Sequence, residues 1–435
     1  MRTAVWLYLF SFIAIFDLHA QYPILTPFAV SLGAAPSFIG LMMGLYSITH
    51  LPGNIIAGWS VDRFGSRIFI VLSLLAAGFI LLLQSRVDDP WQLLVLRSIS
   101  GFVLAFLSPA CMALLARITA DRILQGKLMA GNGLVHTLAS VVSPAVGALL
   151  VARLGFELSF FALGWLLIGT AVCALLFIRD IRQPAAADAA HAGMPGSHGA
   201  AGSAAHPSAA HQDAAHPAKA YPASAHSAKA RQAAQHPATP RRDAPPPAAA
   251  DDDLPLPWLV YVLPSAMSCA QGILSFELPL LALHDHSIMQ TGLLFSVLSL
   301  GSLVTLSMMF LHRYSSLRRT LAGAVTLALS YFTAAVGDLV PLHALLFIIG
   351  MAKGVIYPAL STLLIELTGS AKYGRTFSVL SIAYSVGAFL GPLAAGYVRD
   401  AISPYFIAFL VLMAGAALLP FAGPRRLHTA SSRIG

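Results

Sequence analysis

Residues 58–67 read Gly58-Trp59-Ser60-Val61-Asp62-Arg63-Phe64-Gly65-Ser66-Arg67. This short stretch holds an acid and two bases, and an apolar run lies on either side of it, at about 37–59 and 68–85. Its two glycines permit a tight turn and the close approach of a neighbouring backbone. A charged turn between apolar runs of about 20 residues is typical of a loop that joins two membrane-spanning helices.

The composition of the whole chain agrees with a membrane location. Of the 435 residues, 57% are hydrophobic and 10% are charged, whereas soluble chains carry about 25% charged residues. The net charge of +8 comes from bases in short loops instead of one contiguous face, which argues against nucleic-acid binding. The three cysteines lie inside apolar runs, without disulfide or metal-type spacing. We expect a polytopic membrane protein.

Twelve apolar runs are long enough to cross a bilayer as helices. They cover about residues 4–30, 37–59, 68–85, 91–115, 127–151, 157–178, 255–282, 289–311, 320–337, 341–365, 375–398 and 403–423. The first run could alternatively be a cleaved signal peptide that ends near Ala20. We favour a helix, because the apolar run resumes at Tyr22-Pro23-Ile24-Leu25.

Lysine and arginine in the loops predict the orientation. The gaps after odd-numbered helices hold only Arg86, Arg153 and Arg399. The short gaps after even-numbered helices hold Arg63, Arg67, Arg117, Arg122, Lys127, Arg313, Arg318, Arg319, Lys372 and Arg375. We therefore expect both termini and the central segment to be cytoplasmic, in a multi-pass protein of the plasma or inner membrane.

The central segment, residues 183–253, differs from the rest of the chain. Alanine, proline, histidine, serine and glycine dominate it, and such a stretch cannot bury enough apolar surface to fold. We expect a disordered linker between a six-helix bundle at 1–182 and another at 254–424, with a tail at 425–435. The linker contains seven of the fifteen histidines, so a metal-binding tract is an alternative.

The two predicted bundles repeat each other. Pro27 and Gly40-Leu41 correspond to Pro279 and Gly292-Leu293 at an offset of 252. Gly101 and Pro109-Ala110 correspond to Gly350 and Pro358-Ala359 at 249, and Gly126 and Pro144 to Gly374 and Pro392 at 248. Parallel repeats of this kind are related by an axis along the membrane normal and are typical of secondary transporters.

With these features, the chain resembles the major facilitator superfamily over almost its whole length outside the linker. Residues 58–67 are similar to that family's loop G-x-x-x-D-R-x-G-x-R/K, and Arg97 with Gly101 to its R-x-x-x-G pattern. Residues 143–147 are a degenerate form of the G-P-x-x-G motif of proton-driven drug antiporters. The resemblance implies an all-α fold of two pseudo-symmetric six-helix bundles and is strongest to the drug:proton antiporter branch.

The resemblance also implies a role for the polar loop. Asp62 would sit against the N-terminal end of the eleventh helix near Gly374, and Arg63 and Arg67 would pair with acids such as Asp121. Together with Gly58 and Gly65, these residues would form a latch that holds the outward-open state. Residues 312–319 of the second half lack the acid and the glycines, so we assign the latch to the first half.

Charged residues inside the spans are candidates for function, because each costs about 2.5–3.5 kcal/mol to insert at the centre of a bilayer. Asp17, with His19 beside it, could carry a proton or could be bonded into a helix kink. Glu277, two residues before Pro279, is a cavity-facing site or a solvated acid at the outer mouth. Arg97 and Lys353 could supply positive charge to the cavity from both halves, or Arg97 could be a structural partner. Glu366 fits a loop network at the end of its helix.

Proline and glycine pairs mark two helices that could bend. Pro144 with Gly147, and Gly391 with Pro392, put helix-bending and close-packing residues on the fifth and eleventh helices. We expect them to serve the rocking of one half against the other, although kinks that face lipid are an alternative.

These features predict a secondary transporter that works by alternating access, most simply a proton-coupled exporter of drug-like or metabolite molecules. A proton-coupled importer of a small organic anion and a non-transporting membrane sensor that uses the His-rich linker are alternatives. No nucleophile with a partnering base, nucleotide loop or metal-ligand cluster stands out, so we expect neither an enzyme nor a cofactor. We expect a monomer in the bilayer, with a small-molecule substrate and protons as its partners.

Overall fold

The structure is a computed structural model that describes residues 2–119, 121–178, 258–284, 287–308, 313–337, 339–368 and 373–422. The predicted linker, residues 183–253, and the predicted tail, residues 425–435, lie outside the described residues. Every regular element in the described part of the chain is helical. The all-α fold class predicted from the sequence is therefore confirmed.

The first half contains six spans. They are formed by α1 (Arg2–Ala20) with α2 (Tyr22–Ser31), α3 (Pro36–Phe64), α4 (Ser66–Gln84), α5 (Pro90–Leu104) with α6 (Leu107–Arg117), and α7 (Arg122–Phe177). The last of these is 56 residues long and is broken at Gly155, which has φ 80° and ψ 175°. It therefore supplies two spans, as the apolar runs at 127–151 and 157–178 predicted.

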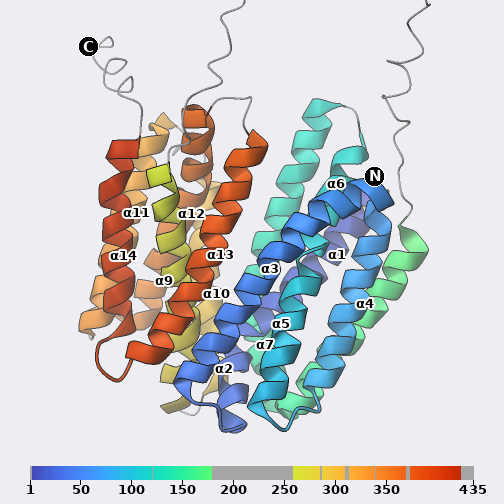
Figure 1. Ribbon diagram of the computed structural model, residues 1–435, viewed down its shortest axis with the longest axis horizontal. Helices are drawn as coiled ribbons and strands as arrows, with labels where there is room; N and C mark the ends of the chain where they lie inside the picture. The colour runs from blue at the N-terminus through green and yellow to red at the C-terminus, as the bar shows by residue number, and fades with distance from the viewer. Residues whose placement is uncertain are drawn as a thin grey trace, which may run out of the picture. The chain divides into compact units, whose positions relative to one another are not determined.

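The second half repeats this pattern with six more spans. They are η1 (Trp258–Tyr261) with α9 (Val262–His284), α10 (Ile288–Ser307), α11 (Ser316–Val336), α12 (Leu342–Thr368), α13 (Tyr373–Val398), and α14 (Pro404–Leu418) with η4 (Leu419–Ala422). Figure 1 shows the helices of both halves. We call the end of each span on the side of residues 58–67 its inner end and the opposite end its outer end.

Ten helical segments in the described residues are long and apolar enough to cross a membrane by length and composition. One of them, Lys127–Phe177, holds the two spans on either side of Gly155. The 29-residue helix α3 is not among the ten. It carries Ser47, His50 and Asn54, which line a cavity, and such polar side chains lower its mean hydropathy.

Two spans are interrupted where proline removes a backbone donor. Pro23 follows the break between α1 and α2 at Gln21, and Pro109 follows the break between α5 and α6 at Ala105-Phe106. A proline ring clashes with the carbonyl four residues earlier, which here belongs to His19 and to Ala105. Each break therefore lies within the turn that precedes its proline.

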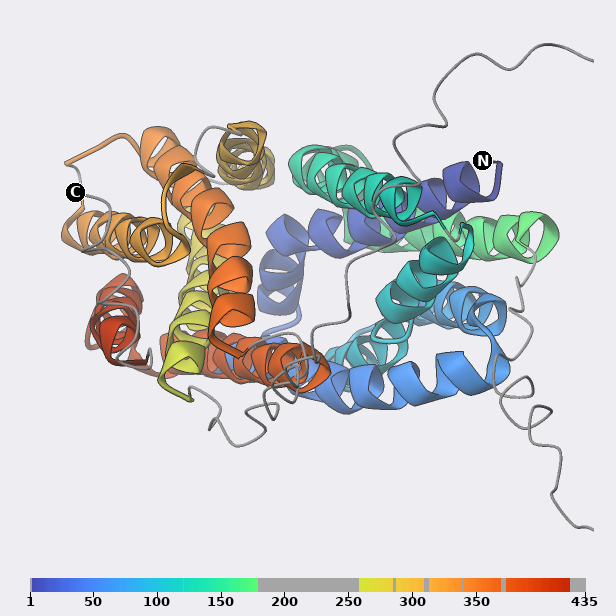
Figure 2. The same ribbon diagram turned by 90° about the horizontal axis from the view of Figure 1, so that it is seen from above.

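The two halves meet mainly along α3 with α13 and α7 with α10, and α2 of the first half also contacts α9 and α10 of the second. Figures 1 and 2 show α3 beside α13. The closest approaches lie toward the outer ends, where a side-chain carbon added at Gly40 would overlap the carbonyl oxygen of Pro392. A side-chain carbon at Gly396 would likewise overlap the carbonyl oxygen of Pro36, and one at Gly292 that of Pro144. Glycine at these positions lets the backbones of the two halves touch.

Candidate transport site

Asp17, Gln21 and Arg97 form a buried hydrogen-bonded chain in the first half. Gln21 donates from Nε2 to Oδ2 of Asp17 at 2.9 Å, and Arg97 donates from Nη1 to Oε1 of Gln21 at 2.7 Å. Their exposed fractions are 1%, 2% and 5%. Gln21 thus links an acid and a base that share no direct ion pair, and the charge of each is stabilised through its amide.

The local sequence explains this arrangement. Asp17 and Gln21 are four residues apart, so they lie on the same side of the helix, and Gln21 occupies the break before α2. Arg97 reaches them from α5, with its guanidinium carbon 4.6 Å from the ring centroid of Tyr46. Gln21 is not among the residues predicted from the sequence; its spacing from Asp17, next to Pro23, was the available signal.

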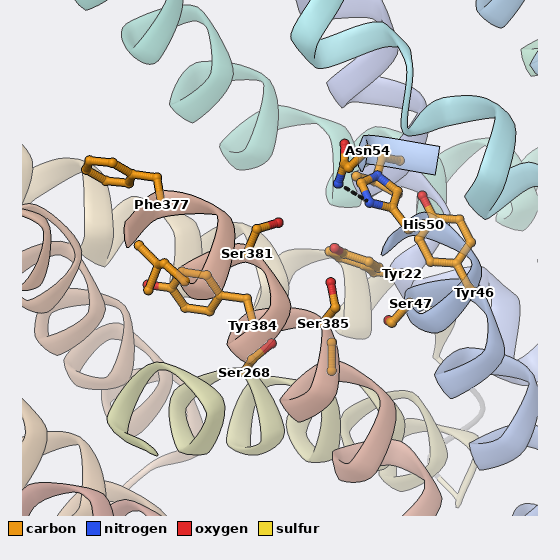
Figure 3. Close-up of a pocket in the computed structure, with 13 residues that line it drawn as sticks. Tyr22, Tyr46, Ser47, His50, Asn54, Ser268, Phe377, Ser381, Tyr384 and Ser385 are labelled. Atoms are coloured by element: carbon orange, nitrogen blue, oxygen red, sulfur yellow. Dashed lines mark hydrogen bonds between the residues drawn. The ribbon is translucent and has the colours of Figure 1, made fainter. Parts of the chain in front are cut away.

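A cavity of about 400 Å³ lies between the halves beside this chain. Its lining comes from both halves and includes Leu18, Tyr22, Tyr46, Ser47, His50, Asn54, Ser268, Phe377, Leu380, Ser381, Tyr384, Ser385 and Ala388. Figure 3 shows hydroxyl and imidazole groups around this space, with Nδ2 of Asn54 and Nδ1 of His50 2.9 Å apart. Aromatic walls with a few polar groups are typical of small-molecule sites.

Tyr22 and Tyr46 connect the cavity to the buried chain. Both line the cavity, while Tyr22 follows Gln21 directly and the ring of Tyr46 lies under Arg97. A molecule in the cavity therefore touches Tyr46, which contacts Arg97, and Tyr22, the chain neighbour of Gln21.

Lys353 forms a similar contact in the second half. It donates from Nζ to Oε1 of Gln271 at 2.5 Å, and Gln271 donates from Nε2 to the hydroxyl of Ser275 at 3.1 Å. A glutamine of the first span thus accepts from a base of the fourth span in both halves. Unlike Arg97, Lys353 has no link to a carboxylate among the described side chains.

His19 packs against two other side chains of the first half. Its Nδ1 is 3.0 Å from the carbonyl oxygen of Ile15, and its ring packs edge-on against Tyr22 and His136 with centroids 5.0 and 6.1 Å apart. Lys353 acts on it electrostatically from the other half. His19, His136 and Lys353 therefore bring basic nitrogen atoms from three spans toward one region.

The other two in-membrane acids lie apart from this site. Glu277 is 5% exposed and its Oε2 is 3.9 Å from Nη2 of Arg399, at the outer ends of α9 and α13. It does not line the cavity described above. Glu366 accepts a hydrogen bond from the hydroxyl of Ser316 at the inner end of α11, which agrees with the loop network predicted for it.

The loop of residues 58–67 has the predicted turn. Gly65 has φ 93°, a conformation that favours glycine. A side-chain carbon at Gly58 would meet no atom within 4 Å. The guanidinium of Arg63 stacks 5.2 Å from the ring centroid of Trp59, and Arg67 donates to the carbonyl of Leu175 at 2.5 Å.

The proposed latch stays a prediction. The side chain of Asp62 and residues 369–372 lie outside the described part of the structure. The described contacts between α3 and α13 include those of Gly40 and Gly44, toward the outer ends of both helices.

The predicted hinge residues lie where helices touch. A side-chain carbon at Gly147 would overlap the carbonyl of Ala20, and one at Gly391 that of Cys269. Pro144 and Pro392 lie at the contacts with Gly292 and Gly40 that join the halves. These positions are therefore packed against protein, in contrast to kinks that face lipid.

This fold, with a cavity between two repeated halves and charges buried beside it, is that of a polytopic membrane transporter. Residues 7–392 match the Major Facilitator Superfamily. The chain belongs to this family.

Curated relatives are similar over part of their length. The chain is 28% identical over 159 residues to an uncharacterized MFS-type transporter of Methanocaldococcus jannaschii, a match that covers 37% of this chain and 41% of the relative. It is 29% identical over 179 residues to multidrug resistance protein 1 of Bacillus subtilis, covering 40% and 43%. The matches thus span about two fifths of these relatives.

Solved structures show the same fold over nearly the whole chain. A bacterial homolog of the human lysosomal transporter Spinster, in an inward-facing and occupied conformation, has a TM-score of 0.66 at 14% identity, with 96% of each chain covered. The human organic anion transporter MFSD10 (TETRAN) has a TM-score of 0.61 at 16% identity, covering 96% of this chain and 99% of that one.

Proposed function

We propose that this transporter exports drug-like or metabolite small molecules in exchange for protons by alternating access, with Asp17 as the proton carrier. The observation that carries the proposal is the Asp17, Gln21 and Arg97 chain beside the cavity. Oδ2 of Asp17 accepts from Gln21, whereas Oδ1 is buried and has no hydrogen-bond partner in the described structure. An acceptor atom without a partner in an apolar interior is suited to take up a proton.

Protonation of Asp17 at Oδ1 would change the whole chain. The carboxyl group becomes neutral, so its hydrogen bond from Gln21 loses the strength that charge gives it. Arg97 then keeps its contact with Gln21 but has no negative charge nearby to balance it. Because Tyr22 and Tyr46 are shared with the cavity, a bound substrate and a bound proton compete for the same local arrangement.

The cavity lining suggests the class of substrate. Tyrosine and phenylalanine rings provide broad apolar surfaces, and serine, histidine and asparagine side chains provide a few hydrogen bonds. Such a site accepts flat or aromatic molecules with scattered polar groups. The similarity to multidrug resistance protein 1 of Bacillus subtilis favours export as the direction.

Everted membrane vesicles with an imposed pH gradient test the proposal. We expect the wild-type chain to accumulate a fluorescent drug-like probe when the lumen is acidic, and Asp17→Asn to lose at least about 90% of this uptake, as general proton carriers do when neutralised. Asp88→Asn is a matched control, because Asp88 is exposed on a loop at the outer end. Equal proton dependence in Asp17→Asn and the wild type would refute the choice of carrier.

We also propose that the chain lies in the plasma or inner membrane with both termini in the cytoplasm, as the distribution of arginine and lysine favours. Protease protection of a tag at either terminus in sealed vesicles tests the orientation. Cleavage of the tag from the outer face of intact cells would contradict it.

A proton-coupled importer of a small organic anion is the second candidate. It is favoured by Lys353, which has no carboxylate partner among the described residues, and by the basic groups of His19 and His136 near it. Uptake of anionic and neutral analogues by intact cells separates the two candidates. An importer accumulates the anion, and Lys353→Gln abolishes that preference.

A membrane sensor is a third reading, which depends on the linker outside the described residues. Deletion of residues 190–245 tests it directly. A transporter without a signalling role keeps its flux after this deletion, whereas a sensor loses its output.

A further inference from the structure

A second cavity lies away from the proposed transport site, along α11 and α12. Its volume is about 510 Å³. Figure 1 shows the two helices side by side. We propose that this α11–α12 groove binds an anionic phospholipid of the surrounding bilayer, with the phosphate group at Arg318 and Arg319 and an acyl chain along the apolar remainder.

The first wall of the groove is one face of α11. Arg319, Ala322, Gly323 and Thr326 line it, and their spacing of three or four residues puts them in a single row along the helix. The row begins with a guanidinium in the first turn and continues with small side chains. Because the exposed Ala322 is small, the row forms a trough there, with Arg319, which is 8% exposed, at its inner end.

The second wall is a matching row on α12. Ile348, Met351 and Val355 face the trough and follow the same spacing. Toward the inner end, Gly323 packs against Ile356, which brings the two helices together at that level. The groove therefore has an apolar length bounded by two helices, which fits an extended hydrocarbon chain.

The groove is open toward the outside of the helix bundle. Arg318, Ala322 and Thr326 are exposed, and Ile348 is 39% exposed. In a multi-pass membrane protein, such a surface faces the bilayer, so lipid is the molecule that meets it at the highest concentration.

The charged end of the groove lies at the inner end of α11, the side that the loop bases predict to be cytoplasmic. Anionic lipids contribute the negative surface of that leaflet, and basic pockets between helices on this side bind their headgroups. A guanidinium matches a phosphate group in geometry as well as charge. Tyr314, which is 60% exposed, adds a phenol at the level expected for headgroups.

Purified full-length protein in mild detergent tests the proposal. We expect native mass spectrometry to show retained phospholipid of the anionic class after extraction from membranes. After delipidation, vesicles of phosphatidylcholine that contain phosphatidylglycerol should raise the midpoint of thermal unfolding, and vesicles of phosphatidylcholine alone should not.

Two kinds of variant locate the site. Arg318→Gln should reduce the preference for phosphatidylglycerol about fivefold, because each base near a membrane surface contributes about 1 kcal/mol to the binding of anionic lipid. The double variant Arg318→Gln/Arg319→Gln should reduce this preference further. Ala322→Trp keeps both arginines and fills the trough at an exposed position, so it should displace the lipid even if the double variant fails to fold. Lys127→Gln, which removes an exposed base near the inner end of α7, is the matched control.

Several results would overturn the proposal. One is equal retention of anionic and neutral lipid by the wild type. Another is a preference for anionic lipid in both Arg318→Gln and Ala322→Trp that is as strong as in the wild type. A third is retention of only a free fatty acid or a transported probe. Loss of preference in Lys127→Gln to the same extent would show a general effect of positive charge and would also contradict a site in this groove.

Discussion

Nη1 of Arg97 lies 2.7 Å from Oε1 of Gln21, and the same amide donates from its nitrogen to Asp17. One neutral side chain therefore joins the acid of the first span to the base of the fourth. Lys353 and Gln271 make the equivalent contact in the second half, where Ser275 takes the place of the acid.

Gln21→Leu should break the link between Asp17 and Arg97 while keeping a side chain of similar size. Both charged groups then lose a buried partner, which costs on the order of 1–3 kcal/mol. We expect a lower midpoint of thermal unfolding in detergent and proton-driven flux reduced about tenfold or more. The control Gln92→Leu, at an exposed position of α5, should change neither the unfolding midpoint nor the flux. An equally small effect of Gln21→Leu would show that the link between Asp17 and Arg97 is unimportant.

Arg97→Met should lower the stability of the protein, whereas Lys353→Met should not. Removal of Arg97 leaves Asp17 buried without the positive charge that Gln21 connects to it, so the unfolding midpoint should fall, by on the order of 1–3 kcal/mol in free energy. Removal of Lys353 takes away a charge that has no carboxylate partner in the described structure. Its loss should be neutral or stabilising, because an unpaired charge inside a protein is costly. Thermal unfolding of the two variants, measured under the same conditions, checks this prediction. An equal fall of the unfolding midpoint in both variants would contradict it.

Gly40→Ala should open the outer contact between the halves. The added methyl group overlaps the carbonyl of Pro392, and overpacking of this kind costs about 1–3 kcal/mol. The equilibrium should shift away from the described conformation by roughly 5- to 150-fold, since about 1.4 kcal/mol corresponds to a factor of ten.

Cysteine labelling measures that shift. Ser47 lines the cavity, so Ser47→Cys should be protected from a membrane-impermeant maleimide added outside and become reactive in the Gly40→Ala background. Gly133→Ala, at a position where a side-chain carbon meets nothing within 4 Å, should not expose it. Unchanged labelling with Gly40→Ala would show that this contact does not close the outer side.

Glu277 and Arg399 should act as a structural pair. Their charged atoms are 3.9 Å apart and lie outside the cavity lining. We expect Glu277→Gln to keep the proton dependence of transport, unlike Asp17→Asn. A double-mutant cycle of Glu277→Gln with Arg399→Gln should give a coupling free energy of at most about 1 kcal/mol, since Arg399 is partly exposed. Loss of proton dependence in Glu277→Gln would assign it a part in coupling instead.

The sequence was sufficient for the fold because its signals are local. Apolar runs of membrane-spanning length predict helices without reference to any partner, since a backbone in lipid must satisfy its hydrogen bonds within the segment. Interruptions were harder to predict. The breaks at Gln21 and Ala105 depend on how a proline distorts the turn before it, and that distortion lies inside an apolar run with no change in composition.

The candidate site was predicted only as a set of separate charges. Scarcity of charge inside the spans identified Asp17, Arg97, Glu277 and Lys353, because each is costly to insert. It could not identify Gln21 or Gln271, since a neutral amide within an apolar run is not unusual in itself. It also could not show that Glu277 lies outside the site that contains Asp17, because the distance between the two acids depends on how the helices pack.

The amino-acid sequence by itself determined that this chain spans a membrane as two repeated sets of helices, with a polar turn at residues 58–67. Hydrophobicity and length suffice for that, because both act on each segment alone. Only the tertiary structure decided which charges meet. Arg97 lies 2.7 Å from Gln21, and Glu277 lies 3.9 Å from Arg399, because the rotation and packing of the helices bring together residues that are far apart in the chain.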